Sequence, residues 1–518
     1  MEILQKRFDS RLLAVLGALG CVLLASLGFA AVSSAAVPEA GQNCVESEGK
    51  ISGAGSTYQN NLQEEVAKFY RNDFCGATGV ETAEDKIGGT ERGEAGNTMI
   101  AYNYVSAEKN KGTGSGAGLK AASCRTEAFF GTDLPYSLEQ LEWLDEAPGT
   151  LVEAHEGVTC ASTIKGKFDP PFQPDSPEEW PDKAAGKEDT TATLMSFPIG
   201  GSSVALPVYL TAATCENNAA NVPTSLEFTT KEVSRLLGGE AKEWNEAELI
   251  ANNPALKHCP TKITRVVRFD NSGTTSILKN YLIREEGNAG GGERKTYATC
   301  APANNWTAYP PGKNPNTEWP GKQEPGKEGA CSEITTAGEN GGPALITKLK
   351  ATPGGIGYAD LSNAAPPEGA GLILPTVENG EESGAEPPSE GNAANCTYKV
   401  VTLPKGSTSN DVGLNPRDNW SNNNETIAGN ENHNNATDKG KLYPICGLTF
   451  NLVYTGLHVA AGGANPISRL SNDQRRTLYS YETYLLSPIA QEKLGTVYYH
   501  GVPESWLPLL RAGFQKNF

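Results

Sequence analysis

Three segments of the sequence each pair strand-forming residues with a turn of small polar residues and then a helical pattern. The turns read GAGSTY at residues 53–58, GTGSGAG at residues 112–118 and DNSGTT at residues 270–275. This repeated order of strand, short polar turn and helix is typical of α/β folds with parallel strands. Each turn also directs free backbone N–H groups and the positive end of a helix toward whatever lies above it.

One such turn by itself is typical of an ordinary helix cap, and that interpretation remains open for each turn taken alone. Arg268 adds a second signal, because it lies four residues before Ser272 in the stretch VVRFDNSGTTSILKNYL, residues 266–282. Its planar guanidinium can bind two oxygens at once. Three turns and one arginine together predict a site for a tetrahedral oxyanion.

The motifs also resemble a known family. GAGSTY, GTGSGAGL, FFGTDLPYS, VVRFDNSGTTSILKNYL and PGGIGYADLS are similar to motifs of the phosphate-binding proteins of bacterial phosphate ABC importers, and they occur in the same chain order. The resemblance implies the type II periplasmic-binding-protein fold, with two α/β lobes and the ligand in the cleft between them. It implies the lobes 50–198 plus 446–518 and 199–445, and it leaves unexplained the long insertions around 285–342 and 376–440.

The resemblance further implies a set of phosphate ligands. They are Thr57, Tyr58, Ser115, Asp133, Arg268, Ser272, Gly273 and Thr274, with Asp270 supporting the arginine. The family usually has Phe in place of Tyr58, and the expected contact there is made by the backbone. We therefore expect the tyrosine to matter little.

Asp133 is the most informative of these residues, because a carboxylate beside an anion needs an explanation. A protonated phosphate oxygen can donate to an ionised carboxylate, whereas sulfate carries no proton at neutral pH. A site built to bind a ligand hydroxyl discriminates strongly against an analogue that lacks it. The hypothesis is selection of phosphate over sulfate, although Asp133 taken alone could equally be an acidic residue at a helix N-terminus.

Composition limits the other function classes. The chain has 518 residues, which predicts more than one lobe, and its net charge of −18 argues against a nucleic-acid partner. None of the five His residues lies at metal-ligand spacing from another, and no GxSxG nucleophile motif occurs. Together with the resemblance, this predicts a monomeric binding protein without metal, cofactor or catalysis. Its partners would be inorganic phosphate and the permease subunits of an importer, to which it would deliver the phosphate. A surface-anchored sensor or adhesion protein, and a phosphatase, are the alternatives.

The N-terminus and the cysteines indicate export. Residues 1–36 combine a basic start, an apolar run of 21 residues at 12–32 and small residues before Ala36, which predicts a cleaved secretory signal. A run of this length could also span a bilayer as a retained anchor. We expect a periplasmic, cell-wall-associated or secreted protein. The ten cysteines beyond Cys21 predict five disulfides between sequence neighbours, such as Cys215–Cys259 and Cys300–Cys331.

Overall fold

The computed structural model describes part of the chain. The described residues are 51–70, 100–102, 114–124, 127–133, 194–288, 319, 336–378, 384–388, 443–454 and 472–517. The chain divides into two compact units, Met1–Val37 and Pro38–Phe518, and every element below belongs to the second. The predicted signal segment therefore lies outside the described residues. Within the described ranges, no helix has the length and apolar character needed to cross a membrane.

A six-stranded mixed sheet has the strand order β10-β4-β13-β3-β1-β2. Its strands are β1 (Ile51–Gly55), β2 (Ile100–Tyr102), β3 (Phe129–Thr132), β4 (Leu194–Ala205), β10 (Ala359–Asp360) and β13 (Cys446–Tyr454). β1 pairs in parallel with β2 and β3, whereas β13 runs antiparallel to both β3 and β4. The parallel pairs agree with the strand–turn–helix pattern of the sequence, and the antiparallel pairs bring in residues from near the C-terminus.

A second sheet of four strands has the order β5-β9-β7-β8, and a third contains three short strands. The four are β5 (Val208–Tyr209), β7 (Thr264–Arg268), β8 (Thr336–Glu339) and β9 (Gly355–Gly357), and β7 pairs in parallel with β8 and β9. The three are β6 (Glu227–Phe228), β11 (Thr376–Glu378) and β12 (Ala385–Glu386).

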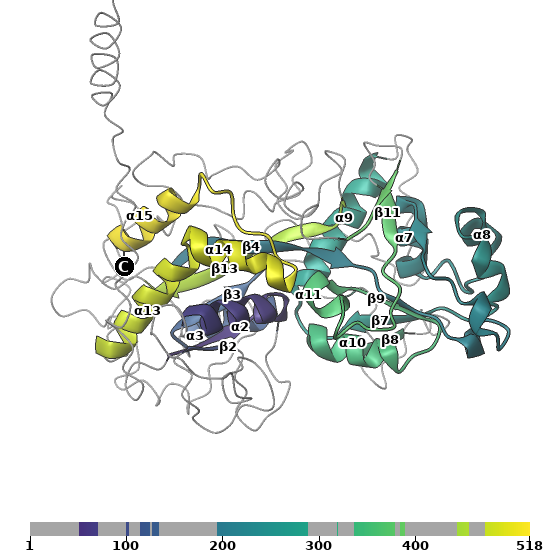
Figure 1. The fold of residues 1–518 in the computed structure, drawn as a ribbon, viewed down its shortest axis with the longest axis horizontal. Coiled ribbons are helices and arrows are strands. Elements are labelled where there is room, and N and C mark those ends of the chain that lie inside the picture. The colour runs from purple at the N-terminus through teal and green to yellow at the C-terminus, as the bar shows by residue number, and fades with distance from the viewer. Residues whose placement is uncertain are drawn as a thin grey trace, which may run out of the picture. The chain divides into compact units, whose positions relative to one another are not determined.

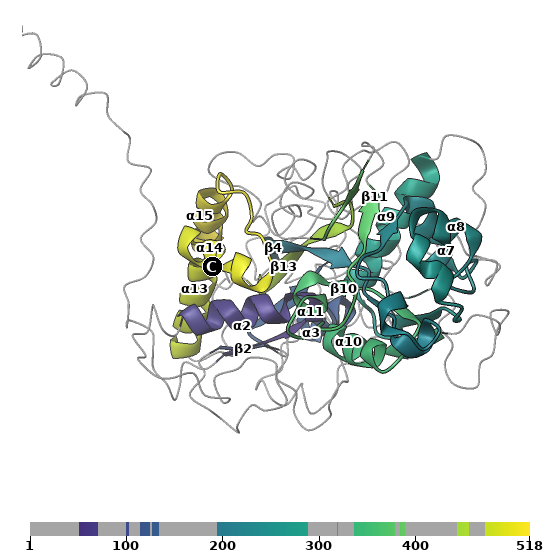
Figure 2. The same cartoon turned by 45° about the vertical axis from the view of Figure 1, so that its right-hand side comes forward.

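Helices surround both larger sheets, with α2, α3 and α13 to α15 on one side of β4 and β13 and α7 to α10 on the other (Figures 1 and 2). The α-helices are α2 (Asn60–Phe69), α3 (Ser115–Cys124), α7 (Thr230–Gly238), α8 (Ala247–Asn252), α9 (Gly273–Asn288), α10 (Gly342–Lys350), α11 (Leu361–Ala364), α13 (Asn472–Leu485), α14 (Pro488–Lys493) and α15 (Leu507–Asn517). Short 3₁₀ helices are η1 (Thr57–Gln59), η6 (Ala212–Thr214), η7 (Ala219–Asn221), η8 (Pro254–His258) and η11 (Leu494–Val497).

Local sequence explains where α7 begins and ends. Thr229 and Glu232 form a reciprocal capping box, in which each side chain accepts a hydrogen bond from the other residue's backbone N–H. Gly239 ends the helix with φ of +86°, a left-handed conformation that glycine adopts without steric cost.

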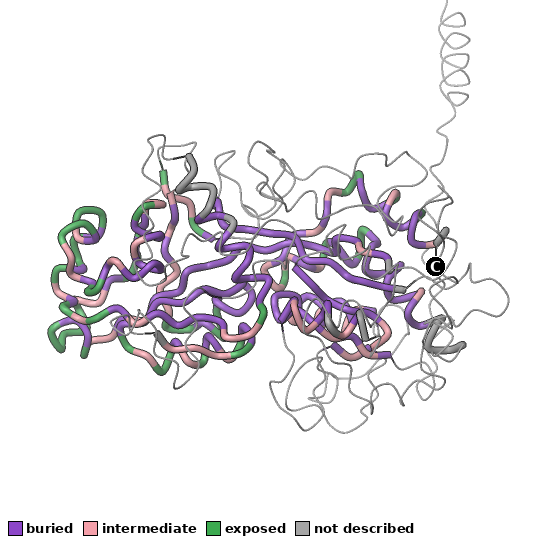
Figure 3. Tube along the Cα trace, turned by 180° about the vertical axis from the view of Figure 1, so that it is seen from behind, coloured by how far each residue is buried: buried purple, intermediate pink, exposed green. Residues whose placement is uncertain are grey.

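The long pair formed by β4 and β13 is buried over residues 197–205 and 446–453, as the buried trace in Figure 3 shows. The register shifts between Thr449 and Phe450, because Thr449 lies opposite Gly200 and Phe450 opposite Pro198. Proline has no N–H to donate to a ladder, so a bulge beside Pro198 accommodates it within the sheet. The irregularity lies at the predicted boundary between the two lobes, after residue 198.

Regular structure extends into both predicted insertions. α9 continues to Asn288, and residues 336–339 form β8 against β7, so the two ends of the 285–342 range belong to the fold. At the start of the 376–440 range, β11 pairs with β12 and with β6. Apart from Trp319, the interior of the first range and everything after residue 388 in the second lie outside the described residues.

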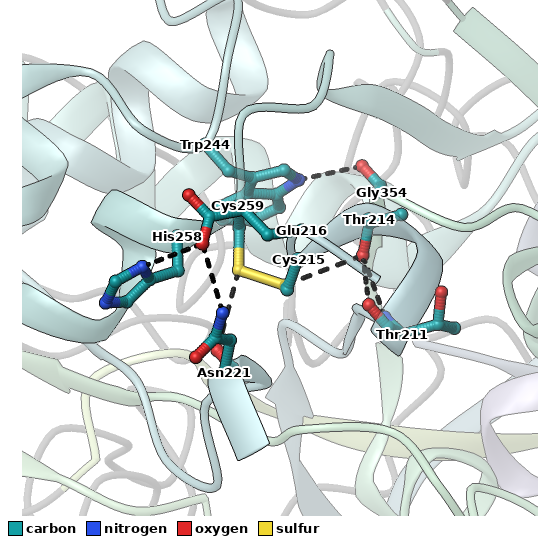
Figure 4. Close-up of a disulfide and its surroundings, with 9 residues drawn as sticks. All are labelled: Thr211, Thr214, Cys215, Glu216, Asn221, Trp244, His258, Cys259 and Gly354. Atoms are coloured by element: carbon teal, nitrogen blue, oxygen red, sulfur yellow. Dashed lines mark hydrogen bonds and ion pairs between the residues drawn. A yellow bond between two sulfur atoms is a disulfide. The ribbon is translucent and has the colours of Figure 1, made fainter. Parts of the chain in front are cut away.

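The predicted disulfide between Cys215 and Cys259 is confirmed (Figure 4). It joins the residues that follow η6 and η8, and both cysteines are fully buried. Cys446 is also disulfide-bonded. Cys300 and Cys331 lie outside the described residues, so that pairing stays a prediction.

Candidate functional site

The three polar turns lie against one another through backbone hydrogen bonds. Gly114 N–H donates to the Gly55 carbonyl at 3.0 Å, and Gly116 N–H donates to the Asn271 carbonyl at 2.9 Å. A Cβ on Gly55 would lie 2.0 Å from the Gly131 carbonyl oxygen, so the close approach requires glycine there. The first two turns therefore touch each other, and the second also touches the third.

Asp133, directly after β3, is the centre of a cluster of hydroxyl groups. The Ser56 and Ser115 hydroxyls donate to its Oδ2 at 2.6 and 3.0 Å, and the Thr449 hydroxyl donates to its Oδ1 at 2.8 Å. All four residues are almost completely buried. Three donors thus converge on one carboxylate that has no contact with bulk solvent.

The three hydroxyls are held as donors because each also accepts an N–H. These N–H groups come from Tyr58 N (3.0 Å, to Ser56), Asp133 N (2.9 Å, to Ser115) and Gln59 Nε2 (2.8 Å, to Thr449). A hydroxyl has a single proton, which remains available for the carboxylate once its oxygen accepts. The arrangement favours an ionised Asp133 that acts only as a hydrogen-bond acceptor.

Two opposing effects set the charge of Asp133. Burial raises the pKa of this carboxyl and outweighs the lowering by the hydrogen bonds from Ser56, Thr449 and Ser115 and by the charge of Arg268, so that the resulting pKa is about 6. The carboxyl is therefore mostly ionised near pH 7. It becomes protonated, and can itself donate, as the pH falls below about 6.

Arg268 ends β7 and is 2% exposed. Its Nε donates to Asp270 Oδ1 at 2.6 Å, and its Nη2 contacts Asp270 Oδ2. Its backbone N–H donates to the Tyr358 hydroxyl at 3.1 Å. Burial lowers the pKa of Arg268, but the charge and hydrogen bonds of Asp270 outweigh this and leave the pKa above its ordinary value. A permanently charged guanidinium is therefore fixed beside the second turn.

The turn at 272–274 packs directly against Asp133. Ser272 Oγ accepts from Thr275 N–H at 3.2 Å and caps the start of α9. A Cβ on Gly273 would lie 2.3 Å from Ser115 Oγ and 2.4 Å from Asp133 Oδ2. Thr274 is buried beside it. Only glycine fits at position 273, so the N-terminus of α9 can lie close to the carboxylate.

Thr57 and Asp270 both contact a further glycine turn, at the start of α10. Gly342 N–H donates to Thr57 Oγ1 at 3.1 Å, and Gly341 N–H donates to Asp270 Oδ1 at 3.2 Å. This segment lies at the end of the insertion predicted around residues 285–342, so sequence reasoning did not assign it to the site. Its glycine-rich start before the helix α10 resembles the other three turns. Of the nine residues expected from the sequence, six are therefore in contact with one another or with this turn: Thr57, Ser115, Asp133, Arg268, Asp270 and Gly273.

Tyr58 has a role that the sequence did not predict. Its hydroxyl accepts from Ser202 N–H at 3.0 Å and lies 3.1 Å from the Gly447 carbonyl, so it connects β4 with β13. Its backbone N–H donates to Ser56 within the local cap. A phenylalanine could make neither of the side-chain bonds.

Sequence reasoning missed Thr449 in particular. A signal was present, because Thr449 and Asn451 are polar residues two apart in an otherwise apolar strand and so share one face. Sequence reasoning also did not single out Asp360, a second buried carboxyl group that interacts electrostatically with Arg268. Burial raises the pKa of Asp360 more than the hydrogen bonds from Ser362 and Asn363 lower it, so that the resulting pKa is about 6. Over the described part of the chain, no group of three or more His, Cys, Asp or Glu side chains could hold a metal ion.

Comparison with known families adds an independent finding. Residues 183–402 match the model of the PBP superfamily domain. This match lies within the central part of the 518-residue chain and shows that these residues resemble the PBP superfamily domain. The predicted resemblance is thereby confirmed, together with the mixed α/β, two-lobed fold class that it implied.

Sequence relatives of this chain include the phosphate-binding protein PstS of Xylella fastidiosa, strains Temecula1 and 9a5c. Each is 28% identical over 180 residues, which is 34% of this chain and 38% of the relative. The match therefore spans less than half the length of these curated relatives.

Solved structures support the fold across a larger share of the chain. A high-affinity periplasmic phosphate-binding protein has a TM-score of 0.50 at 16% identity, over 89% of this chain and 93% of its own. A human phosphate-binding apolipoprotein has a TM-score of 0.52 at 15% identity, over 89% and 94%. At these identities the similarity shows the fold alone.

Proposed function

We propose that this protein binds inorganic phosphate outside the cytoplasm and delivers it to the permease subunits of an ABC importer. In this proposal the lobes are residues 50–198 plus 446–518 and residues 199–445, and phosphate binds between them. The names of the PstS relatives support the proposal, as does the arrangement of polar groups around Asp133.

The observation that carries the proposal is the polarity of the Asp133 cluster. Three hydroxyl donors hold the carboxylate as an acceptor, and Arg268 lies close enough to lower its pKa. A ligand that suits both groups must be an anion and must also carry a proton to donate. Phosphate at neutral pH satisfies both conditions.

Sulfate satisfies only the first condition. It would bring negative charge to an ionised Asp133 without donating to it, and an unmatched buried polar group costs about 1–3 kcal/mol, more when charged. Protonated oxyanions such as phosphate and arsenate should therefore bind much more tightly than sulfate.

The other expected ligands supply the positive side of the site. Arg268 would bind two ligand oxygens, and the N-termini of α3 and α9, which begin at Ser115 and Gly273, would direct backbone N–H groups toward the anion. The hydroxyls of Ser272 and Thr274 would add donors. Thr57 and Tyr58 would complete the contacts from the first turn, and Asp270 would keep the guanidinium in place.

Titration calorimetry of the purified protein with phosphate, arsenate and sulfate tests the proposal. We expect tight binding of the first two anions and weak or no binding of sulfate. Arg268→Ala should abolish phosphate binding, whereas Arg235→Ala, which removes an arginine bonded to Glu240, Glu246 and Glu248, should preserve it. Equal affinity for phosphate and sulfate would contradict the role of Asp133.

Asp133→Asn provides the matched test of that role. The amide keeps the shape of the side chain but presents a donor in place of one acceptor oxygen, so phosphate affinity should fall and the preference over sulfate should narrow. Hydrolysis of a chromogenic phosphate monoester by the pure protein would instead favour the phosphatase alternative.

A further inference from the structure

A chain of buried side-chain amides connects Asp133 with a second buried carboxyl group. It begins at Thr449 on β13 and continues through Gln59 on η1, Gln63 on α2 and Asn451 on β13 to Glu482 on α13. All five side chains belong to residues that are 0% exposed. The proposed binding of phosphate uses only Thr449 from this chain of hydrogen bonds, and a buried polar chain of this length is costly unless every member has its partner.

The direction of hydrogen-bond donation along the chain is fixed at one point by the Phe450 carbonyl. Gln59 approaches that oxygen with Nε2 at 3.1 Å, and a carbonyl oxygen can only accept. The opposite end of the Gln59 amide is therefore its oxygen, which accepts from Gln63 Nε2 at 2.7 Å. The orientation of the first amide thus determines that of the second.

The same logic continues to the far carboxyl. Gln63 Nε2 also donates to Asn451 Oδ1 at 2.9 Å, while its Oε1 accepts from the Tyr481 hydroxyl at 2.5 Å. Asn451 Nδ2 then donates to both oxygens of Glu482, at 3.1 and 3.0 Å. Each link is consistent with the next, and both ends of the chain terminate on a carboxyl group that accepts.

The consequence for the site appears at Thr449. Its oxygen accepts from Gln59 Nε2 at 2.8 Å, so its single proton is directed to Asp133 Oδ1 at 2.8 Å, with the Thr132 carbonyl a longer alternative at 3.3 Å. If Gln59 did not donate, Thr449 would be free to reverse its role and leave Asp133 with one donor fewer.

We propose that Gln59 and Thr449 are specificity-determining positioning residues, which keep Asp133 ionised and so set the preference of the site for a protonated oxyanion, with Gln63, Asn451 and Glu482 fixing the Gln59 amide. The proposal rests on the proposed function of phosphate binding. Thr449 touches Asp133, and Gln59 acts through Thr449.

Other groups contribute to the charge of the two carboxyls and remain unchanged in the tests below. Those that act on Asp133 or its neighbours are Arg268, Asp270, Asp360, Tyr58, Tyr102 and Tyr499. Those that act on Glu482 or its neighbours are Tyr481, Tyr70 and Tyr484. A variant that removes only a hydroxyl or an amide donor therefore isolates the contribution of the buried hydrogen-bond chain to the charge of Asp133.

Calorimetric measurement of phosphate and sulfate affinity from about pH 5 to about pH 9 tests the proposal. Thr449→Val removes the hydroxyl with little change of volume, and Gln59→Glu replaces the amide donor with an acceptor. Each should weaken phosphate binding near pH 7 by about tenfold or more, since one hydrogen bond to a charged group is lost. Each should also shift the acid limb of the phosphate profile to higher pH and reduce the ratio of phosphate to sulfate affinity.

Two further variants separate positioning from general destabilisation. Thr449→Ser keeps the hydroxyl and should restore the acid limb and the affinity ratio. Gln491→Glu makes the same change as Gln59→Glu in a buried glutamine that donates to the carbonyls of Ile199 and Leu485, so it should lower stability without changing the ratio.

The outcomes distinguish this inference from the function on which it rests. If the wild-type protein binds neither anion, the proposed function fails and the inference fails with it. If the wild type prefers phosphate but Thr449→Val and Gln59→Glu keep its pH profile and affinity ratio, only the inference is overturned. A shift of equal size in Gln491→Glu would also overturn it.

Discussion

Replacing Glu482 with Gln should make the stability of this protein much less sensitive to pH. Burial raises the pKa of Glu482 from 4.5 to about 8, and the hydrogen bonds from Asn451 offset only part of this. The folded protein therefore keeps a proton that the unfolded chain releases between these two pH values. The stability that this retained proton contributes is fully present below about pH 4.5, declines as the pH rises, and is lost above about pH 8.

The size of the effect follows from the two pKa values. The folded and unfolded pKa values differ by about 3.5, and a pKa difference of one corresponds to about 1.4 kcal/mol. The contribution of Glu482 to the free energy of unfolding therefore changes by at most about 5 kcal/mol. Glutamine has nearly the same shape and no titrating group, and its oxygen can still accept from Asn451. At about pH 5 the variant should be slightly less stable than the wild type, because its amide nitrogen faces one Asn451 donor.

Urea unfolding at several values from about pH 5 to about pH 9, without phosphate, measures this effect. The free energy of unfolding of the wild type should fall relative to Glu482→Gln by several kcal/mol across the series. Asp133 and Asp360 also have raised pKa values, but both proteins retain them, so the difference isolates Glu482. Glu504→Gln, a change at an exposed residue, is the control for general loss of charge. A constant difference between wild type and variant at every pH would refute the reasoning.

Three other changes should have defined effects. Gly273→Ala places a Cβ 2.3 Å from Ser115 Oγ, so calorimetry should show phosphate binding weakened by about tenfold or more, whereas Gly495→Ala meets nothing within 4 Å and should bind normally. Tyr58→Phe removes the partner of the buried Ser202 N–H and should lower the free energy of unfolding by about 1–3 kcal/mol; an unchanged value would contradict the assigned role of the hydroxyl. Replacing both Cys215 and Cys259 with Ser opens a loop of 44-residue separation and should cost about 2–4 kcal/mol in denaturant unfolding.

Much of the fold could be predicted because its signals are local. Each polar turn, its preceding strand and its following helix occupy a short continuous stretch, so residue type alone indicates the element. The antiparallel pairing of β13 with β3 and β4 could not be predicted in this way, because strand partners far apart in the chain are chosen by tertiary packing. The role of the Tyr58 hydroxyl depends on that pairing, which explains why the sequence suggested only a backbone contact there.

The candidate site likewise combines features that local sequence predicts with features that depend on tertiary contacts. By itself the sequence determined the fold class, the glycine turns and the arginine, since steric freedom at glycine and the geometry of guanidinium are properties of single residues. The tertiary structure alone decided what surrounds Asp133, because Thr449 lies 316 residues away along the chain. The strand register that places Phe450 opposite Thr132 brings the neighbouring Thr449 hydroxyl to the Asp133 carboxylate. Hydrogen-bond partners so distant in sequence are selected by strand register and burial, and a local pattern contains no record of either.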